Sequence, residues 1–161
     1  MQFRVVDLGR DWKGPQPIPN LAEARNTFLA DLKDNEYVLF IDSDEEAPRM
    51  LLDYISRLKP QYPYYAIRRL EIFNNRVVPK FNPFFKGCLL SNKVKYVGHP
   101  HELVYPRKPV GWIDLPIIHN HVGKTAYVQP EWYTTRLFRF LQVVFKLRDI
   151  AIGWDKYATN V

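Results

Sequence analysis

The order of apolar and polar residues predicts alternating strands and helices in the first part of the chain. Residues 3–8 are mostly apolar and predict a short buried strand, and residues 9–19, which are rich in Gly and Pro, predict a loop. Residues 20–33 carry apolar side chains at helical spacing. Asn20 is a favourable N-cap in front of them, so an amphipathic helix is expected. Residues 37–41 form an unbroken apolar run, which is typical of a strand buried on both faces.

The later segments predict the same class of fold with a more irregular second half. Pro48 suits the start of a second helix. Its apolar face would consist of Met50, Leu51, Tyr54, Ile55 and Leu58. Residues 64–73 predict another strand and 74–75 a turn, residues 77–122 predict short strands without a long helix, and residues 130–148 predict a C-terminal helix. We therefore expect an α/β fold with a mixed, mostly parallel sheet flanked by helices.

Composition adds a basic charge and restricts the cysteine chemistry. The chain of 161 residues fits a single domain, and 23 Lys and Arg against 17 Asp and Glu give a formal charge of +6. This charge suits an anionic partner such as a nucleotide, a nucleic acid or a lipid headgroup. Cys88 is the single cysteine, which excludes an intrachain disulfide and favours a small buried side chain. Neither a secretory signal nor an apolar run of bilayer length is present, so we expect a soluble intracellular protein.

An acidic cluster follows the apolar run of residues 37–41. Asp42 and Asp44 are two residues apart, so in an extended segment their carboxylates would point the same way and meet one hard cation such as Mg²⁺ or Mn²⁺. The carboxyl ends of strands form the ligand crevice in open α/β sheets, which also favours a metal site here. The alternative is a helix N-terminus that uses Glu45 and Glu46 against its dipole.

Four segments, in order along the chain, resemble the family 2 glycosyltransferases of the GT-A fold. They are Ala24-Arg25-Asn26; the apolar strand that ends in Asp42-Ser43-Asp44-Glu45; Lys95 to Glu102, which ends in a His-Glu pair; and Pro116-Ile117-Ile118-His119. The resemblance covers residues 20–123. It implies a GT-A-like sheet in a single domain, with residues 1–60 as the nucleotide- and metal-binding half, 61–128 as the acceptor half and 129–161 as a C-terminal helix and tail.

The resemblance also implies a reaction and its machinery. A sugar would pass from a nucleotide sugar, such as a UDP- or GDP-sugar, to a glycan, lipid-linked or protein acceptor, with inversion at the anomeric centre. Asp42 and Asp44 would hold Mn²⁺ or Mg²⁺, His119 would be a metal or phosphate neighbour, and Glu102 would be the general base. From its sequence context alone, Glu102 is better explained as the outward face of a strand.

Three further residues are implied on the nucleotide side. Arg25 would contact phosphate or base. Asp7 would end the last strand of a nucleotide-binding half that is shorter than is usual in the family, and Ser43 lies between the two metal-binding aspartates. The chain is therefore expected to be a minimal or N-terminally shortened member.

The histidines form two His-x-His pairs. They are His99 with His101 and His119 with His121. On strands the members of each pair would face one way, so a histidine metal site is conceivable. The alternative is that one member of each pair lines the cleft and the other is packed or exposed.

The predicted helix of residues 130–148 interleaves aromatic and basic side chains. Such a helix suits peripheral membrane contact and, almost as well, single-stranded nucleic acid, and the plainer alternative is that it packs its aromatics on the sheet. We expect a cytoplasmic protein, peripheral at a membrane through this helix and able to form a homodimer, and we do not expect nucleic acid as its partner. The alternative to the glycosyltransferase is a non-catalytic module that binds nucleic acid or a membrane surface. A metal-dependent phosphodiesterase or nuclease is a third hypothesis.

Overall fold

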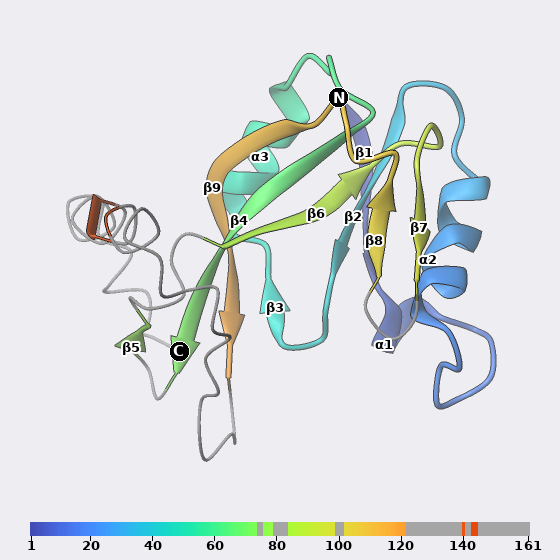
Figure 1. The fold of residues 1–161 in the computed structure, drawn as a ribbon, viewed down its shortest axis with the longest axis horizontal. Helices are drawn as coiled ribbons and strands as arrows, with labels where there is room; N and C mark the ends of the chain where they lie inside the picture. The colour runs from blue at the N-terminus through green and yellow to red at the C-terminus, as the bar shows by residue number, and fades with distance from the viewer. Residues whose placement is uncertain (74–75, 79–83, 99–101, 122–139, 141–142, 145–161) are drawn as a thin grey trace.

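The computed structural model describes residues 1–73, 76–78, 84–98, 102–121, 140 and 143–144 (Figure 1). The strands are β1 (Gln2–Asp7), β2 (Glu36–Ile41), β3 (Glu45–Glu46), β4 (Tyr64–Phe73), β5 (Arg76–Val77), β6 (Phe84–Leu90), β7 (Lys95–Val97), β8 (Leu103–Tyr105) and β9 (Gly111–Asn120). The helices are α1 (Leu8–Asp11), α2 (Leu21–Ala30) and α3 (Arg49–Arg57). The described residues thus form a mixed α/β fold made largely of sheet.

The main sheet has the strand order β1-β2-β6-β4-β9-β3, with β5 beside β4. The pairs β1–β2 and β4–β9 are parallel, whereas β6 is antiparallel to both β2 and β4, and β3 is antiparallel to β9. The sheet is therefore mixed, as expected, but the expectation that it is mostly parallel is wrong. The physical reason lies in the order of the strands: β6 pairs antiparallel with β4, since no described helix lies between them to cross over, whereas β9 returns parallel to β4 only after β6, β7 and β8.

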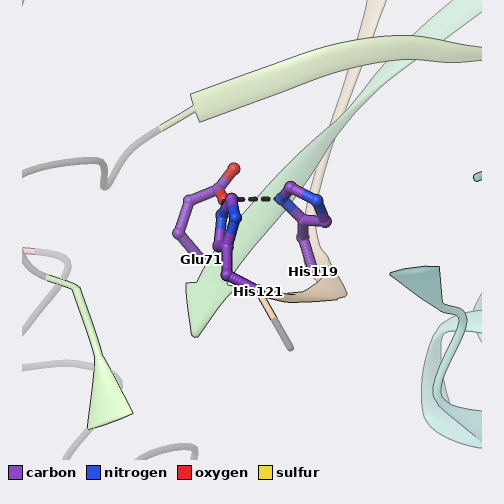
Figure 2. Close-up of side chains that lie close together, drawn as sticks. All are labelled: Glu71, His119 and His121. Atoms are coloured by element: carbon purple, nitrogen blue, oxygen red, sulfur yellow. Dashed lines mark hydrogen bonds and ion pairs between the residues drawn. The ribbon is translucent and has the colours of Figure 1, made fainter. Parts of the chain in front are cut away.

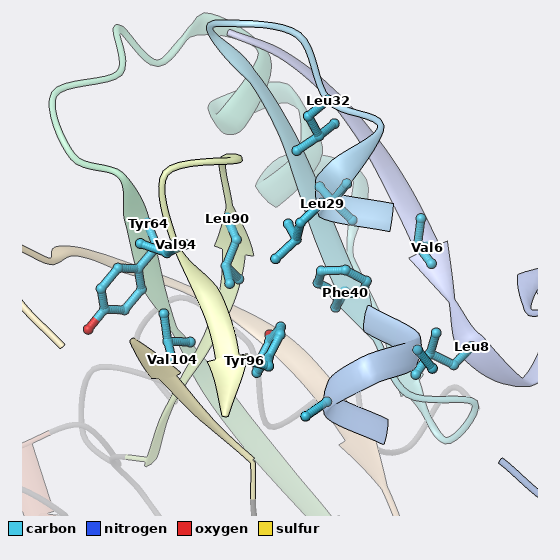
Figure 3. Packing of buried hydrophobic residues seen from close by; sticks show 13 residues of the cluster. Val6, Leu8, Leu29, Leu32, Phe40, Tyr64, Leu90, Val94, Tyr96 and Val104 are labelled. Carbon is cyan, nitrogen blue, oxygen red and sulfur yellow. The ribbon is translucent and has the colours of Figure 1, made fainter. Parts of the chain in front are cut away.

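Each face of the sheet carries its own layer. On one face, α2 and the antiparallel β7–β8 hairpin cover β2 and β6, and this layer is built around Leu29, Phe40, Leu90, Tyr96 and Val104 (Figure 3). On the other face, Leu51 and Ile55 of α3 pack on Leu39 of β2 and on Ile67 and Ile117. The two layers make β2 a strand buried on both faces, as its apolar run predicted.

The N-cap of α2 follows the prediction, whereas α1 and α3 differ from it. The side chain of Asn20 accepts hydrogen bonds from the main-chain N–H of Ala22 and Glu23 at 3.0 and 3.2 Å, so the N-cap is confirmed. The predicted loop after β1 instead begins with the short helix α1, because Asp7 caps it by accepting from the N–H of Gly9 at 2.8 Å.

The second difference concerns α3. Two of its predicted apolar positions, Met50 and Tyr54, are exposed, since only one side of this nine-residue helix meets the sheet. Cys88 is confirmed as a buried residue.

Several predictions fall on residues that the structure does not describe. The turn at 74–75, the pair His99 and His101, and nearly all of the predicted helix 130–148 lie outside the described residues. Among the residues that are described, no helix is long and apolar enough to cross a membrane.

Candidate functional site

Two parallel strands bring acidic residues to one edge of the sheet. In the β1–β2 register Asp7 lies beside Ile41, so Asp7 and Asp42 stand at neighbouring carboxyl ends. A side-chain carbon at Gly9 would lie 3.3 Å from Asp7 Oδ1 and 3.6 Å from Ser43 Cβ, which places these two predicted residues beside the same glycine. The structure thus brings together Asp7, Asp42 and Ser43, as a ligand site at strand ends requires.

Asp42 is held between two cations. Its carboxylate accepts from Arg25 Nη2 at 3.0 Å and from Lys86 Nζ at 2.7 Å. Burial opposes the ionisation of Asp42, but the charges of Lys86 and Arg25 prevail and lower its pKa below the ordinary value. Asp42 is therefore an anion at neutral pH, with one oxygen against each cation.

Lys86 also joins Asp42 to a buried glutamate. Its ammonium contacts Glu45, whose side chain is fully buried, and the main-chain N–H of Asp42 donates to the same carboxylate at 2.9 Å. Glu45 belongs to β3, which pairs with β9, and α3 has no acidic residue in its first turn. The alternative in which Glu45 and Glu46 serve a helix dipole is therefore wrong.

The segment after β2 turns sharply. The N–H of Glu45 donates to the carbonyl of Asp42 at 2.8 Å, which closes a turn at Ser43 and Asp44. The expected extended segment is therefore wrong, because the chain must reverse to pair β3 with β9. As a result the two aspartates face different partners: Asp42 contacts Arg25 and Lys86, and Asp44 contacts His119.

Two consecutive residues of α2, Arg25 and Asn26, contact the neighbouring hairpin. Asn26 holds its backbone, and Arg25 places a positive charge beside it. Asn26 donates to the carbonyl of Tyr96 at 2.9 Å and accepts from the N–H of the same residue at 2.8 Å. Arg25 lies 5.1 Å from the centre of the Tyr96 ring and reaches Glu102 at 3.5 Å as well as Asp42. The Ala24-Arg25-Asn26 segment thus ties strand β7 and the acidic strand end to one helix.

Glu102 and Asp42 line the same cavity, which has a volume of about 710 Å³. Arg25 and Lys86 also line this cavity. Arg25 contacts both carboxylates, and Lys86 contacts Asp42. One oxygen of Glu102, Oε1, is buried and has no hydrogen-bond partner within the described part of the chain. The cavity therefore contains a buried carboxylate oxygen that is able to accept a proton.

Aromatic side chains also line the same cavity. They include Phe84, Phe85 and Trp112. The rings of Phe85 and Trp112 meet edge to face at 5.1 Å, and Trp112 is 63% exposed at the outside. A cavity lined by both charged groups and aromatic rings suits a ligand that has both an anionic and a ring-shaped part.

The second charged group gathers at β4 and β9 (Figure 2). Glu71 lies beside His119 in the parallel β4–β9 register, and one of its oxygens, Oε2, is 2.6 Å from His119 Nδ1 and 2.6 Å from His121 Nε2. The other nitrogen of His119, Nε2, is 3.1 Å from Asp44 Oδ2. The prediction that His119 and His121 face one way is therefore confirmed.

The surroundings of His119 favour its doubly protonated form. Its two partners, Glu71 and Asp44, are carboxylates, which as anions only accept hydrogen bonds, so a proton on each ring nitrogen satisfies both contacts. Burial lowers the pKa of His119, but the hydrogen bond and charge of Glu71 outweigh it, and the pKa is raised.

Arg69 connects the two charged groups. It donates to Glu71 at 2.6 Å and to Glu45 at 3.2 Å. Burial opposes the ionisation of Glu71, yet the hydrogen bond from His119 and the charge of Arg69 lower the pKa of Glu71 to about 2. An unbroken chain of ion pairs thus runs from Asp42 through Lys86, Glu45 and Arg69 to Glu71.

Sequence reasoning missed four members of this network. They are Glu45 as a buried partner, Arg69, Glu71 and Lys86. A usable signal was present, because charged residues inside apolar strands must find partners when the strand is buried. Arg69 and Glu71 interrupt the predicted strand of residues 64–73, and Lys86 stands between Phe85 and Gly87.

Comparison with known proteins does not assign the chain to a family. No family model matches it, and no curated protein does.

Proposed function

We propose that the protein is a metal-dependent glycosyltransferase of the GT-A type, which transfers a sugar from a nucleotide-diphosphate sugar to an acceptor hydroxyl. The observation that carries the proposal is the shared cavity of Asp42 and Glu102, with Arg25 in contact with both. Acidic residues at the ends of parallel strands β1 and β2 support it, because such strand ends are where α/β sheets bind nucleotides.

The oxygen chemistry of Asp42 and Asp44 suits a hard divalent cation, and because the turn now directs the two carboxylates at different partners, binding one ion would draw them away from Lys86 and His119. Asp42 and Asp44 offer carboxylate oxygens, and their side chains are 41% and 44% exposed, so solvent and a diphosphate reach them. Mn²⁺ or Mg²⁺ bound there would stabilise the negative charge that develops on the departing nucleoside diphosphate. His119, which donates to Asp44 in this structure, would then be a neighbour of the ion.

The side chains of the cavity would perform the remaining steps. Arg25 and Lys86 supply positive charge beside Asp42, where the diphosphate would lie. Asp7 and Ser43 stand at the neighbouring strand end, where they would contact the rest of the nucleotide. Glu102 would take the proton of the acceptor hydroxyl as that oxygen attacks the anomeric carbon, and a direct displacement of this kind inverts the centre.

The test is turnover of sugar nucleotides by the full chain. UDP- and GDP-sugars are supplied with Mn²⁺ or Mg²⁺, and release of nucleoside diphosphate is measured, since hydrolysis reports the donor site even without the acceptor. We expect metal-dependent release by the wild type and a loss of at least about 100-fold in Asp44→Ala. Asp53→Ala, which removes an exposed carboxylate on α3, is the matched control and should stay active.

Two outcomes would overturn the proposal. One is the absence of both binding and hydrolysis for every sugar nucleotide, and the other is full activity in Asp44→Ala. Salt-sensitive binding to polyanions or anionic vesicles that survives Asp44→Ala, without affinity for nucleotides, would favour the non-catalytic binding module instead.

A further inference from the structure

We propose that Glu71, His119 and His121 form a binding site for a divalent transition-metal ion such as Zn²⁺. One ligand atom from each side chain lies within 4.8 Å of the other two. The three residues are 1%, 7% and 7% exposed. This site differs from the Asp42 and Asp44 site in its ligand chemistry and does not depend on the proposed glycosyl transfer.

The strands position the three ligands without distortion. Glu71 of β4 is in register with His119 of β9, and His121 follows two residues later, just past the end of that strand, on the same side as His119 (Figure 2). The N–H of His121 donates to the carbonyl of Ile72 at 2.9 Å, which continues the pairing beyond the strand end. The two imidazole rings are 4.1 Å apart between centres. The positions of the three ligands are therefore set by the backbone of two adjacent strands, β4 and β9.

The present distances describe the metal-free arrangement. One oxygen of Glu71 accepts from both imidazoles at 2.6 Å each. Ligands about 2.0–2.1 Å from a tetrahedral zinc ion lie about 3.4 Å apart, so each imidazole nitrogen needs to move away from the Glu71 oxygen by less than about 1 Å. A bound ion would take the place of the two protons that His119 Nδ1 and His121 Nε2 now direct at the carboxylate.

Two of the ligands already have the outer partners typical of metal sites. A metal-binding histidine usually donates its other N–H to a carboxylate, and His119 Nε2 donates to Asp44 in this way. Ligating carboxylates are hydrogen-bonded in turn, and the second oxygen of Glu71 accepts from Arg69 at 2.6 Å. These contacts fix which atom of each side chain faces the shared centre.

The ligand set selects the kind of metal. Two imidazole nitrogens and one carboxylate oxygen suit Zn²⁺ and related transition metals, whereas Mg²⁺ and Ca²⁺ prefer oxygen ligands alone. Because Asp44 contacts His119, the site would adjoin the proposed donor metal without sharing its ligands. A metal ion here would brace β4, β9 and the turn that carries Asp44.

The test is direct metal binding by the metal-stripped full chain. Co²⁺ is titrated as a spectroscopic probe, and Zn²⁺ by calorimetry. We expect one ion per chain, visible Co²⁺ absorption typical of low-coordinate nitrogen and oxygen ligation, and weak or no competition by Mg²⁺. Glu71→Gln and His121→Ala should each weaken Zn²⁺ binding by more than about 100-fold, beyond the 10–100-fold typical of outer partners.

Controls separate this site from the donor site and from misfolding. Asp53→Ala should keep wild-type Zn²⁺ affinity. Asp42→Asn should also keep it, although this variant is expected to lose sugar-nucleotide turnover. X-ray absorption at the zinc edge of the wild type should count two imidazoles, and this readout needs no variant to fold. The proposal is overturned if the wild type binds neither ion at micromolar concentrations, if the zinc edge lacks two imidazoles, or if folded Glu71→Gln and His121→Ala bind as the wild type does.

Discussion

At the scale of single residues, the two carboxylates of the cavity, Glu102 and Asp42, differ in their hydrogen-bond partners. One oxygen of Glu102 is 3.5 Å from Arg25 Nη1, while the other is buried without a hydrogen-bond partner among the described residues. Asp42, in contrast, has a cation against each oxygen. Glu102 therefore has an oxygen available to take a proton from a substrate hydroxyl, whereas both oxygens of Asp42 are occupied by cations.

Glu102→Gln tests this difference. The amide keeps the size of the side chain but cannot accept the acceptor's proton. We expect kcat for glycosyl transfer to fall by about 10²–10⁴-fold while KM for the donor stays within a few-fold, as steady-state kinetics would measure. Unchanged kcat would mean that Glu102 serves only as the ionic partner of Arg25.

At the scale of elements, α2 carries both a cation for the site and the attachment of the β7–β8 hairpin. Asn26 satisfies the N–H and the carbonyl of Tyr96 at once. The hairpin, in turn, brings Tyr96 over the Arg25 guanidinium and places β8 directly after Glu102. Loosening the hairpin therefore loosens the cavity wall.

Removing the Asn26 side chain should destabilise the fold measurably. Asn26→Ala leaves two main-chain groups of Tyr96 without partners, so we expect the free energy of unfolding to fall by about 2 kcal/mol in urea denaturation. Asn92→Ala is the matched control. It removes a single hydrogen bond, to the carbonyl of Leu32 at 3.1 Å, and should cost about 1 kcal/mol. An equal loss of unfolding free energy in the two variants would contradict the role of Asn26 in holding both main-chain groups of Tyr96.

At the scale of the whole molecule, the sheet separates two apolar layers that must form together. Strand β6 lies between β2 and β4 and contributes Leu90 to one layer and Cys88 and Leu89 to the other. Cys88 is fully buried, and this burial raises the pKa of its thiol to about 12. Its accessibility thus reports whether the central sheet is intact.

Cys88 should be inert in the folded protein. Burial blocks access and keeps the thiol protonated at pH 8, so we expect negligible reaction with a disulfide reagent in native buffer and one reactive thiol per chain in concentrated denaturant. The extent of labelling along a denaturant series should follow the loss of secondary structure measured by circular dichroism. Rapid labelling in native buffer would show that the sheet opens without global unfolding.

Local patterns predicted the elements better than they predicted the site. The apolar run at 37–41 and the cap at Asn20 depend on neighbouring residues, and both are present as expected. The contact of Glu71 with His119 joins residues 48 positions apart and depends on the β4–β9 register, which no local pattern specifies. The turn after Asp42 was missed for the same reason, since it is set by the pairing of β3 with β9.

The central claim is that the acidic end of β2 binds metal and nucleotide diphosphate, and a crystal soaked with Mn²⁺ and UDP tests it most directly. We predict an anomalous manganese peak about 2.0–2.3 Å from carboxylate oxygens of Asp44 and Asp42, bridged to the diphosphate, with UDP in the cavity that Arg25 and Glu102 line. Binding of this metal should displace Lys86 from Asp42. A well-diffracting soak in which neither manganese nor UDP occupies this strand end would contradict the account.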